Sequence, residues 1–211
     1  MYKILISGYY GFNNIGDESI LSAVVDNLKE KLDDIQITVL SQNPESTAEK
    51  YDVRSVNRKS VRSIFSAVRQ CDLLISGGGS LLQDATSSRS IYYYLFIMWL
   101  ANLLGKKFLI YSQGIGPIKS KFNRKMTARM LGKASGIVVR DETSAEFLQE
   151  IGIPGERIVV TADPVLRIKP AELETGRNIL REEGFVHEEG KRVIGFAMKE
   201  KKISSQFVDE T

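Results

Sequence analysis

Short apolar runs alternate with helical patterns along most of this chain, and no other feature limits its possible fold as much. The runs are rich in β-branched and aliphatic residues and span 2–7, 36–40, 71–75, 107–111, 136–139 and 158–161. Helical periodicity fills the gaps at 17–32, 61–70, 91–104, 122–132 and 142–151. Strands that are apolar on both faces belong to parallel sheets covered by helices on both sides. The sequence therefore predicts an α/β fold built on a Rossmann-like, doubly wound parallel sheet.

The composition favours a folded protein with little net charge. Of the 211 residues, 43% are hydrophobic, which is enough for a packed core. The 29 basic and 26 acidic residues are too balanced to indicate a nucleic-acid partner or an anionic membrane. The segment Met1–Ile6 lacks the basic flank and long apolar region of a signal peptide, and the single cysteine, Cys71, is expected to fill the core. These features favour a reduced, cytoplasmic protein.

Four loops that follow predicted strands are rich in glycine and polar side chains. They span residues 8–18 (GYYGFNNIGDE), 76–84 (SGGGSLLQD), 112–117 (SQGIGP) and 140–144 (RDETS). Ligands of open α/β sheets bind beyond the carboxyl ends of the strands, where such loops gather. We therefore expect all four loops to line one edge of the sheet and to hold a polar ligand.

The glycines and charged residues of these loops have a structural and a functional interpretation. The run Gly77 to Gly79 either permits a tight turn or lets the backbone approach a ligand. Asp17 and Glu18 either stabilise the start of a helix or act on a ligand, and Asp17 is the stronger candidate because Gly16 leaves its surroundings open. Arg140 either pairs with a neighbouring carboxylate or clamps a phosphate or carboxylate of the ligand. We favour the ligand-binding interpretation for the glycines and for Arg140.

Several common chemistries do not fit the sequence. The glycine-rich loops lack the lysine of a nucleotide P-loop and the spacing of a dinucleotide fingerprint. One histidine, His187, and one cysteine cannot assemble a zinc site of the usual kinds or a nucleophilic triad. We therefore expect no metal site and no hydrolysis of a nucleoside triphosphate.

The segment 91–104 is the most apolar of the helical patterns. It falls short of the roughly 20 residues that span a bilayer, and we expect a buried helix in preference to a membrane-surface role. Its tyrosines, Tyr92, Tyr93 and Tyr94, are available to line a sugar pocket. The basic cluster at 119–125 is expected to be a solvated helix start in preference to an anion site.

Five motifs, in order, resemble the polysaccharide pyruvyl transferase family. They are GYYGFNNIGDE at 8–18, SGGGSLLQD at 76–84, QGIGP at 113–117, VRDETS at 139–144 and ADPV at 162–165. The resemblance covers residues 1 to about 168 and is greatest to members that pyruvylate the secondary cell wall polysaccharide used for S-layer anchoring.

This resemblance implies a glycosyltransferase-B-like arrangement of two Rossmann-like domains, with the active site between them. It implies transfer of pyruvate from phosphoenolpyruvate, as co-substrate and without a further cofactor, to form a 4,6-ketal on N-acetylmannosamine of a lipid-linked glycan. Arg140 is implied to contribute to the donor clamp, and Asp17 and Asn14 to face the acceptor. The acceptor-side wall is implied to comprise Gly78, Gly79, Ser80, Gln83, Asp84, Gln113 and Gly114.

The family pattern also predicts how the chain is organised. We expect an N-terminal domain over 1–168, a linker over 169–190 and the incomplete start of a second domain over 191–211, with the first strand of that domain at 191–198. Exposed Val193, Ile194 and Phe196 would then favour self-association or pairing with a separate chain. Activity is expected to be impaired by truncation, and two alternatives stay open: a non-catalytic sugar-binding remnant, or half of a nucleotide-sugar glycosyltransferase. The expected location is the cytoplasm, with peripheral association at the inner face of the membrane as an alternative.

Overall fold

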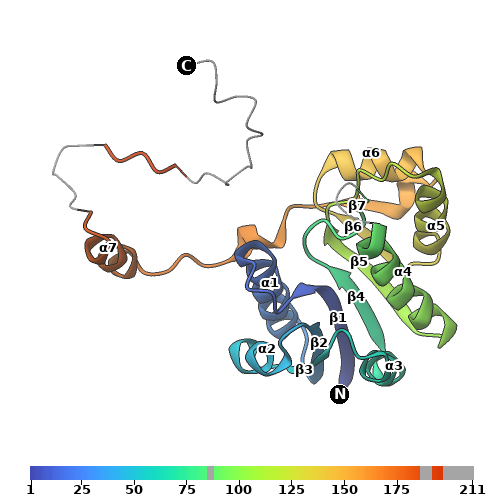
Figure 1. The fold of residues 1–211 in the computed structure, drawn as a ribbon, viewed down its shortest axis with the longest axis horizontal. Coiled ribbons are helices and arrows are strands. Elements are labelled where there is room, and N and C mark those ends of the chain that lie inside the picture. The colour runs from blue at the N-terminus through green and yellow to red at the C-terminus, as the bar shows by residue number, and fades with distance from the viewer. Residues whose placement is uncertain (85–87, 186–191, 197–211) are drawn as a thin grey trace, which may run out of the picture. The chain divides into compact units, whose positions relative to one another are not determined.

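The structure is a computed structural model that describes residues 1–84, 88–185 and 192–196. The chain divides into two units, Met1–Ile168 and Lys169–Thr211. The first unit contains a parallel sheet with helices on both faces (Figure 1). The predicted α/β fold with a doubly wound sheet is thereby confirmed.

Seven strands form the sheet within the described residues, in the order β3-β2-β1-β4-β5-β6-β7, and every neighbouring pair is parallel. Their bounds are β1 Tyr2–Tyr10, β2 Ile35–Ser41, β3 Arg54–Asn57, β4 Leu73–Gly77, β5 Lys107–Gln113, β6 Gly136–Val139 and β7 Ile158–Val160. The strand order reverses between β1 and β4, which is the point where open sheets of this kind leave a crevice for ligands.

The helices of the first unit connect successive strands. They are α1 Ile15–Lys31, α2 Pro44–Tyr51, α3 Val61–Gln70, α4 Ser88–Leu103, α5 Lys121–Leu131 and α6 Glu142–Glu150, with 3-10 turns at Gly155–Arg157 and Pro164–Arg167. Successive residues of a strand point to opposite faces. Accordingly Ile4 and Ile6 of β1 pack in one core layer with α1, whereas Leu5 packs in the other layer with α3 to α6. Burial on both faces explains why the central strands are continuously apolar.

Several elements differ from the prediction. Strand β1 continues to Tyr10, beyond the predicted end at Ser7, because Tyr10 is buried and pairs with Ser41 after a register shift. Strand β3 and helix α2 were not predicted. Strand β3 is a short edge strand of sequence RSVN, which has no apolar run to reveal it.

Helix α4 is not buried on all sides, so the expectation of a buried helix was wrong in part. The side chains of Tyr92, Phe96, Trp99 and Leu103 are between 38% and 60% exposed. Among the described residues, no helix combines the length and apolar character needed to cross a bilayer.

The second unit contains helix α7, Leu173–Glu182, in the segment expected to be a linker. Residues 192–196, expected as part of a strand, have no regular secondary structure, and Val193, Ile194 and Phe196 are exposed. The remainder of that expected strand, His187 and the tail from residue 199 lie outside the described residues.

Candidate functional site

The loop between β1 and α1 is held by hydrogen bonds that leave one acidic side chain unused. Asn14 caps α1, its Oδ1 accepting from two backbone N–H groups of the first turn. Glu18 is buried and accepts from Gly11 N at 2.7 Å and from Tyr51 Oη at 2.7 Å. Asn14 and Glu18 therefore stabilise the loop, whereas the side chain of Asp17, which lies between them in the sequence, makes none of these hydrogen bonds.

Asp17 is a half-buried carboxylate with no hydrogen-bond or ion-pair partner in the part of the chain that the structure describes. Burial raises its pKa, the neighbouring Glu18 raises it further, and the positive charge of Arg140 opposes them. Gly79 lies directly against it: a Cβ at Gly79 would stand 2.6 Å from Asp17 Oδ1. A carboxyl group whose pKa is raised towards neutrality is suited to exchange a proton with a ligand.

Asp17 opens into a pocket of about 310 Å³ that is lined by the end of β1, the first turn of α1, the loop after β4 and the start of α4. The lining combines one carboxylate, hydroxyls, an amide and aromatic rings: Tyr9, Asp17, Ser80, Leu81, Gln83, Ser90 and Tyr94. Aromatic faces pack against the C–H groups of a sugar ring, while the polar groups hydrogen-bond its hydroxyls. The lining therefore suits a monosaccharide unit, and Tyr94 is the member of the tyrosine run that reaches it.

Arg58, in the loop after β3, positions the hydroxyl of Tyr94. It is buried, and it donates from Nη1 to Gly8 O at 3.0 Å and from Nη2 to Tyr94 Oη at 3.3 Å. Its guanidinium carbon lies 4.6 to 5.7 Å from the ring centroids of Tyr9, Phe12, Tyr93 and Tyr94. Burial raises the pKa of Tyr94 to about 12, although Arg58 opposes the shift. Because the tyrosine oxygen accepts from Arg58, its proton is left to donate to a ligand.

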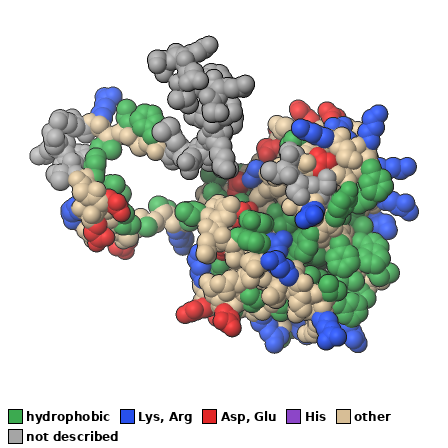
Figure 2. All heavy atoms as spheres, in the orientation of Figure 1, with side chains coloured by type: hydrophobic (Ala, Val, Ile, Leu, Met, Phe, Trp, Pro, Cys, Tyr) green, Lys and Arg blue, Asp and Glu red, His purple; other side chains and the backbone are tan. Residues whose placement is uncertain are grey.

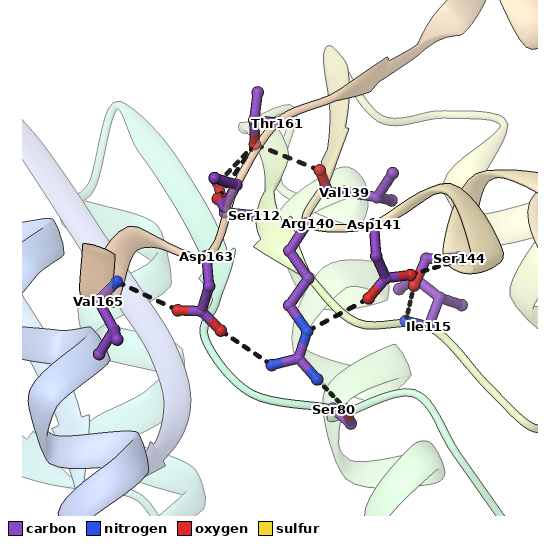
Figure 3. Close-up of polar contacts among 11 residues, drawn as sticks. Ser80, Ser112, Ile115, Val139, Arg140, Asp141, Ser144, Thr161, Asp163 and Val165 are labelled. Atoms are coloured by element: carbon purple, nitrogen blue, oxygen red, sulfur yellow. Dashed lines mark hydrogen bonds and ion pairs between the residues drawn. The ribbon is translucent and has the colours of Figure 1, made fainter. Parts of the chain in front are cut away.

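Arg140 joins three segments at the same edge of the sheet (Figure 3). Its Nη1 pairs with Asp163 Oδ2 at 3.1 Å, its Nη2 donates to Ser80 Oγ at 3.1 Å, and its Nε lies 3.5 Å from Asp141 Oδ2. Gly114 leaves room for the Arg140 guanidinium, since a Cβ at Gly114 would lie 2.9 Å from Arg140 Nε. Arg140 thus pairs with its neighbour Asp141, one of the predicted alternatives, and also with the more distant Asp163.

The predicted loops do meet at one edge of the sheet. Gly114 N donates to Gly79 O at 3.0 Å, which ties the loop after β5 to the glycine run after β4. Gly78 has a φ of +86° and lies close to Tyr10 Oη, which donates to Gly77 O at 2.6 Å. The structure therefore brings six of the predicted residues together: Asp17, Gly79, Ser80, Gln83, Gly114 and Arg140.

Asp84 and Gln113, two other predicted wall residues, do not line this pocket. Asp84 accepts from Lys119 N, Ser120 N and Asn123 Nδ2 at 2.6 to 3.1 Å, so it holds the start of α5. Burial opposes ionisation of Asp84, but these hydrogen bonds outweigh it and lower its pKa. Gln113 is fully buried, and its side-chain amide has no hydrogen-bond partner among the described residues.

Sequence reasoning assigned no role to Asp163, Arg58 or Tyr9. Asp163 belongs to the ADPV motif, which follows a strand of the predicted sheet, and that position was a usable signal. Arg58 follows the unpredicted strand β3, so nothing local indicated its contacts. The described residues contain no group of three or more potential metal ligands among His, Cys, Asp and Glu.

Comparison with known proteins places this chain in a family. The family model for polysaccharide pyruvyl transferase matches residues 14–205. The amylovoran biosynthesis protein AmsJ of Erwinia amylovora is 20% identical over 84% of this chain and 52% of its own length. This chain thus spans about half of that relative.

Solved structures with low identity share the fold. Anabaena Alr3699/HepE, solved with UDP and glucose, aligns with a TM-score of 0.58 and 11% identity over 87% of this chain and 50% of its own. The UDP-GlcNAc 2-epimerase of Neisseria meningitidis, solved with UDP-GlcNAc, aligns with a TM-score of 0.51 and 15% identity over 88% and 54%. Both support a glycosyltransferase-B-like Rossmann fold. With a family match over most of its length, the chain belongs to the polysaccharide pyruvyl transferase family.

Proposed function

We propose that this protein transfers pyruvate from phosphoenolpyruvate to a sugar of a polysaccharide, with the Asp17 pocket holding the acceptor. The acceptor we propose is N-acetylmannosamine in a lipid-linked cell wall glycan, pyruvylated as a 4,6-ketal. The observation that carries the proposal is Asp17 itself, a half-buried carboxylate without a partner among the described residues, in a pocket lined by hydroxyl, amide and aromatic groups. Membership of the family supports the pyruvyl chemistry.

Ketal formation removes two protons from the sugar hydroxyls and delivers two, one to the methylene carbon of phosphoenolpyruvate and one to the departing phosphate. Protonation of the methylene carbon of phosphoenolpyruvate makes C2 cationic, and one sugar hydroxyl adds there and loses its proton. The C2–O bond to phosphate then breaks, phosphate leaves, and the second hydroxyl adds and loses its proton. We assign to Asp17 the removal of a hydroxyl proton, because its raised pKa brings it closer to neutrality. We assign to Tyr94 a hydrogen bond to the acceptor.

Arg140 is proposed to contribute to binding of the anionic donor. Its guanidinium is already held by Asp163 and Ser80, which fixes its position. Its contact with Asp141 is 3.5 Å, at the limit of a hydrogen bond, and is the one that an incoming carboxylate or phosphate would replace.

The proposal is tested by incubating the chain with phosphoenolpyruvate and an N-acetylmannosamine-containing acceptor, and by following both phosphate release and the mass of the acceptor. We expect phosphate release coupled to addition of one pyruvyl ketal, lost in Asp17→Asn. Asp26→Asn, an exposed substitution on the same helix, is the matched control and should retain activity. Turnover of a nucleotide-sugar without phosphoenolpyruvate would contradict the proposal.

A further inference from the structure

Helices α4 and α5 share a surface that the proposed chemistry does not use. Along α4, Tyr92, Phe96, Trp99 and Leu103 are exposed and recur at intervals of three or four residues, so they lie on one face of the helix. The rings of Phe96 and Trp99 stack with their centroids 5.9 Å apart. Large apolar side chains that gather in this way on a surface indicate a binding site.

Helix α5 and the turn after it add further apolar side chains and a row of cations. Phe122 is 63% exposed, and Met126 and Met130 follow it at intervals of four residues. Beside them run Lys125, Arg129 and Lys133, also four residues apart and exposed. A groove of about 450 Å³ separates the helices and is lined by residues of both rows. We call these apolar and basic residues the α4–α5 surface.

The charge on the α4–α5 surface has one sign. Neither α4 nor α5 contains an aspartate or glutamate, although the whole chain has 26 acidic residues against 29 basic ones. Figure 2 shows hydrophobic side chains gathered on the side of the molecule where α4 and α5 lie in Figure 1, with lysine and arginine side chains around them. A ligand that complements this surface is therefore both apolar and negatively charged.

These properties match the face of an anionic bilayer. Tryptophan and tyrosine favour the boundary between lipid headgroups and hydrocarbon. Lysine and arginine bury their aliphatic stems and place their charges among the phosphates. Helix α4 has 16 residues, and among the described residues no helix is long and apolar enough to span a bilayer, so this surface would lie on the membrane.

We propose that the α4–α5 surface docks the protein on anionic phospholipid membranes, with Trp99 and Phe96 entering the interface and Lys125, Arg129 and Lys133 facing the headgroups. This docking would bring a lipid-linked glycan to the protein, but the proposal does not depend on the pyruvyl chemistry. The two are tested by different measurements, so either can fail alone.

Trp99 makes a direct test available, because it is the single tryptophan of the chain. The full chain is mixed with vesicles of phosphatidylcholine alone or of phosphatidylcholine with phosphatidylglycerol, and both sedimentation and tryptophan emission are recorded. We expect co-sedimentation and a blue shift with the anionic vesicles, and neither with the neutral ones. Brominated lipids should quench the emission. Sedimentation without a change in emission would assign membrane binding to another surface and overturn the proposal.

Matched variants separate this surface from non-specific attraction. Lys125→Glu with Arg129→Glu should reduce partitioning at least about tenfold, since each cation near an anionic surface contributes substantially to binding. Arg62→Glu with Arg69→Glu makes the same charge change on α3 and should reduce it much less. Phe96→Ser should weaken binding several-fold, whereas Phe65→Ser, at a similarly exposed phenylalanine of α3, should not.

The proposal would be overturned if the α3 variants lost as much vesicle binding as the matching variants of the α4–α5 surface. An absence of vesicle binding in the wild-type chain would overturn it as well. A blue shift that appears on raising the protein concentration without lipid, together with a dimer in solution, would identify a second copy of the chain as the occupant and would also overturn it. Circular dichroism and thermal melting confirm that each variant is folded before it is compared.

Discussion

Gly79 lies in the loop after β4 and Asp17 in the first turn of α1, yet a single methyl group on Gly79 would collide with the Asp17 carboxylate. A Cβ added to Gly79 would lie 2.6 Å from Asp17 Oδ1, and Gly79 has a φ of +63°. The glycine run after β4 therefore lets the backbone approach the side chain that we place at the centre of the site. A substitution at Gly79 therefore tests the shape of the pocket without altering the Asp17 carboxylate itself.

Replacing Gly79 with alanine should disturb the site more than the same change at Gly105. Both residues have a left-handed backbone, with φ of +63° and +66°, so alanine costs about 1–2 kcal/mol of unfolding free energy at either position. A Cβ at Gly105 meets nothing within 4 Å, whereas at Gly79 it displaces Asp17. We expect acceptor affinity to fall in Gly79→Ala and to persist in Gly105→Ala. Urea denaturation and sugar titration measure the two effects, and equal affinities would refute the assigned packing.

Asp17→Asn should be inactive and yet at least as stable as the wild type at neutral pH. The folded-state pKa of Asp17 is raised, so the unfolded chain releases this proton first as the pH rises. The stability of the wild type relative to Asp17→Asn should therefore decline from about pH 4, the ordinary value for aspartate, until the pH passes the folded-state pKa. Thermal melts of both proteins against pH measure this difference. A variant that is less stable than the wild type at pH 7 would contradict the assignment.

Asp84 should show the opposite linkage. Its pKa is lowered in the folded state because its carboxylate accepts hydrogen bonds at the start of α5, so its stabilising effect is present above about pH 4 and is lost as the pH falls through the folded-state pKa. Asp84→Ala should lower the unfolding free energy by about 0.5–2 kcal/mol at pH 7, as other helix-capping losses do. Acceptor affinity should change little. A large loss of acceptor affinity with an unchanged unfolding free energy would instead indicate that Asp84 contacts the acceptor.

Arg140 and Asp163 can be separated by paired substitutions. Arg140→Lys loses the planar fork that reaches Ser80 and Asp163 together, and should lower the unfolding free energy by about 1.5–3 kcal/mol. If Arg140 binds the donor, the affinity for phosphoenolpyruvate should fall much further in Arg140→Lys than in Asp163→Asn, which removes a structural partner and leaves the cation. Equal losses of affinity in the two variants would limit Arg140 to positioning the loops.

The sequence was sufficient to predict the sheet and the edge at which the loops meet. Continuous apolar strands such as β1 and β4 are visible as runs because both of their faces are buried. Asp17 could be predicted because it stands at a helix start beside glycines. Strand β3 carries polar residues at a sheet edge, and its sequence pattern therefore does not indicate a strand.

The contacts that shape the site were beyond local patterns. Arg58 reaches Tyr94 across 36 residues, and Arg140 reaches Asp163 across 23. Each contact depends on how the strands are ordered in the sheet, which periodicity does not specify. The exposure of one face of α4 could not be predicted from the sequence either. An apolar helix has the same sequence pattern whether its outer face packs against protein or meets another apolar surface.

The most direct test of the proposed chemistry is pyruvyl transfer measured with wild-type protein and Asp17→Asn in parallel, with binding of the N-acetylmannosamine acceptor followed by saturation-transfer NMR. We predict that the wild type binds the acceptor and forms the pyruvyl ketal from phosphoenolpyruvate, and that Asp17→Asn remains folded but loses transfer. Acceptor binding and transfer that are both unaffected by Asp17→Asn would contradict the role we assign to this carboxylate.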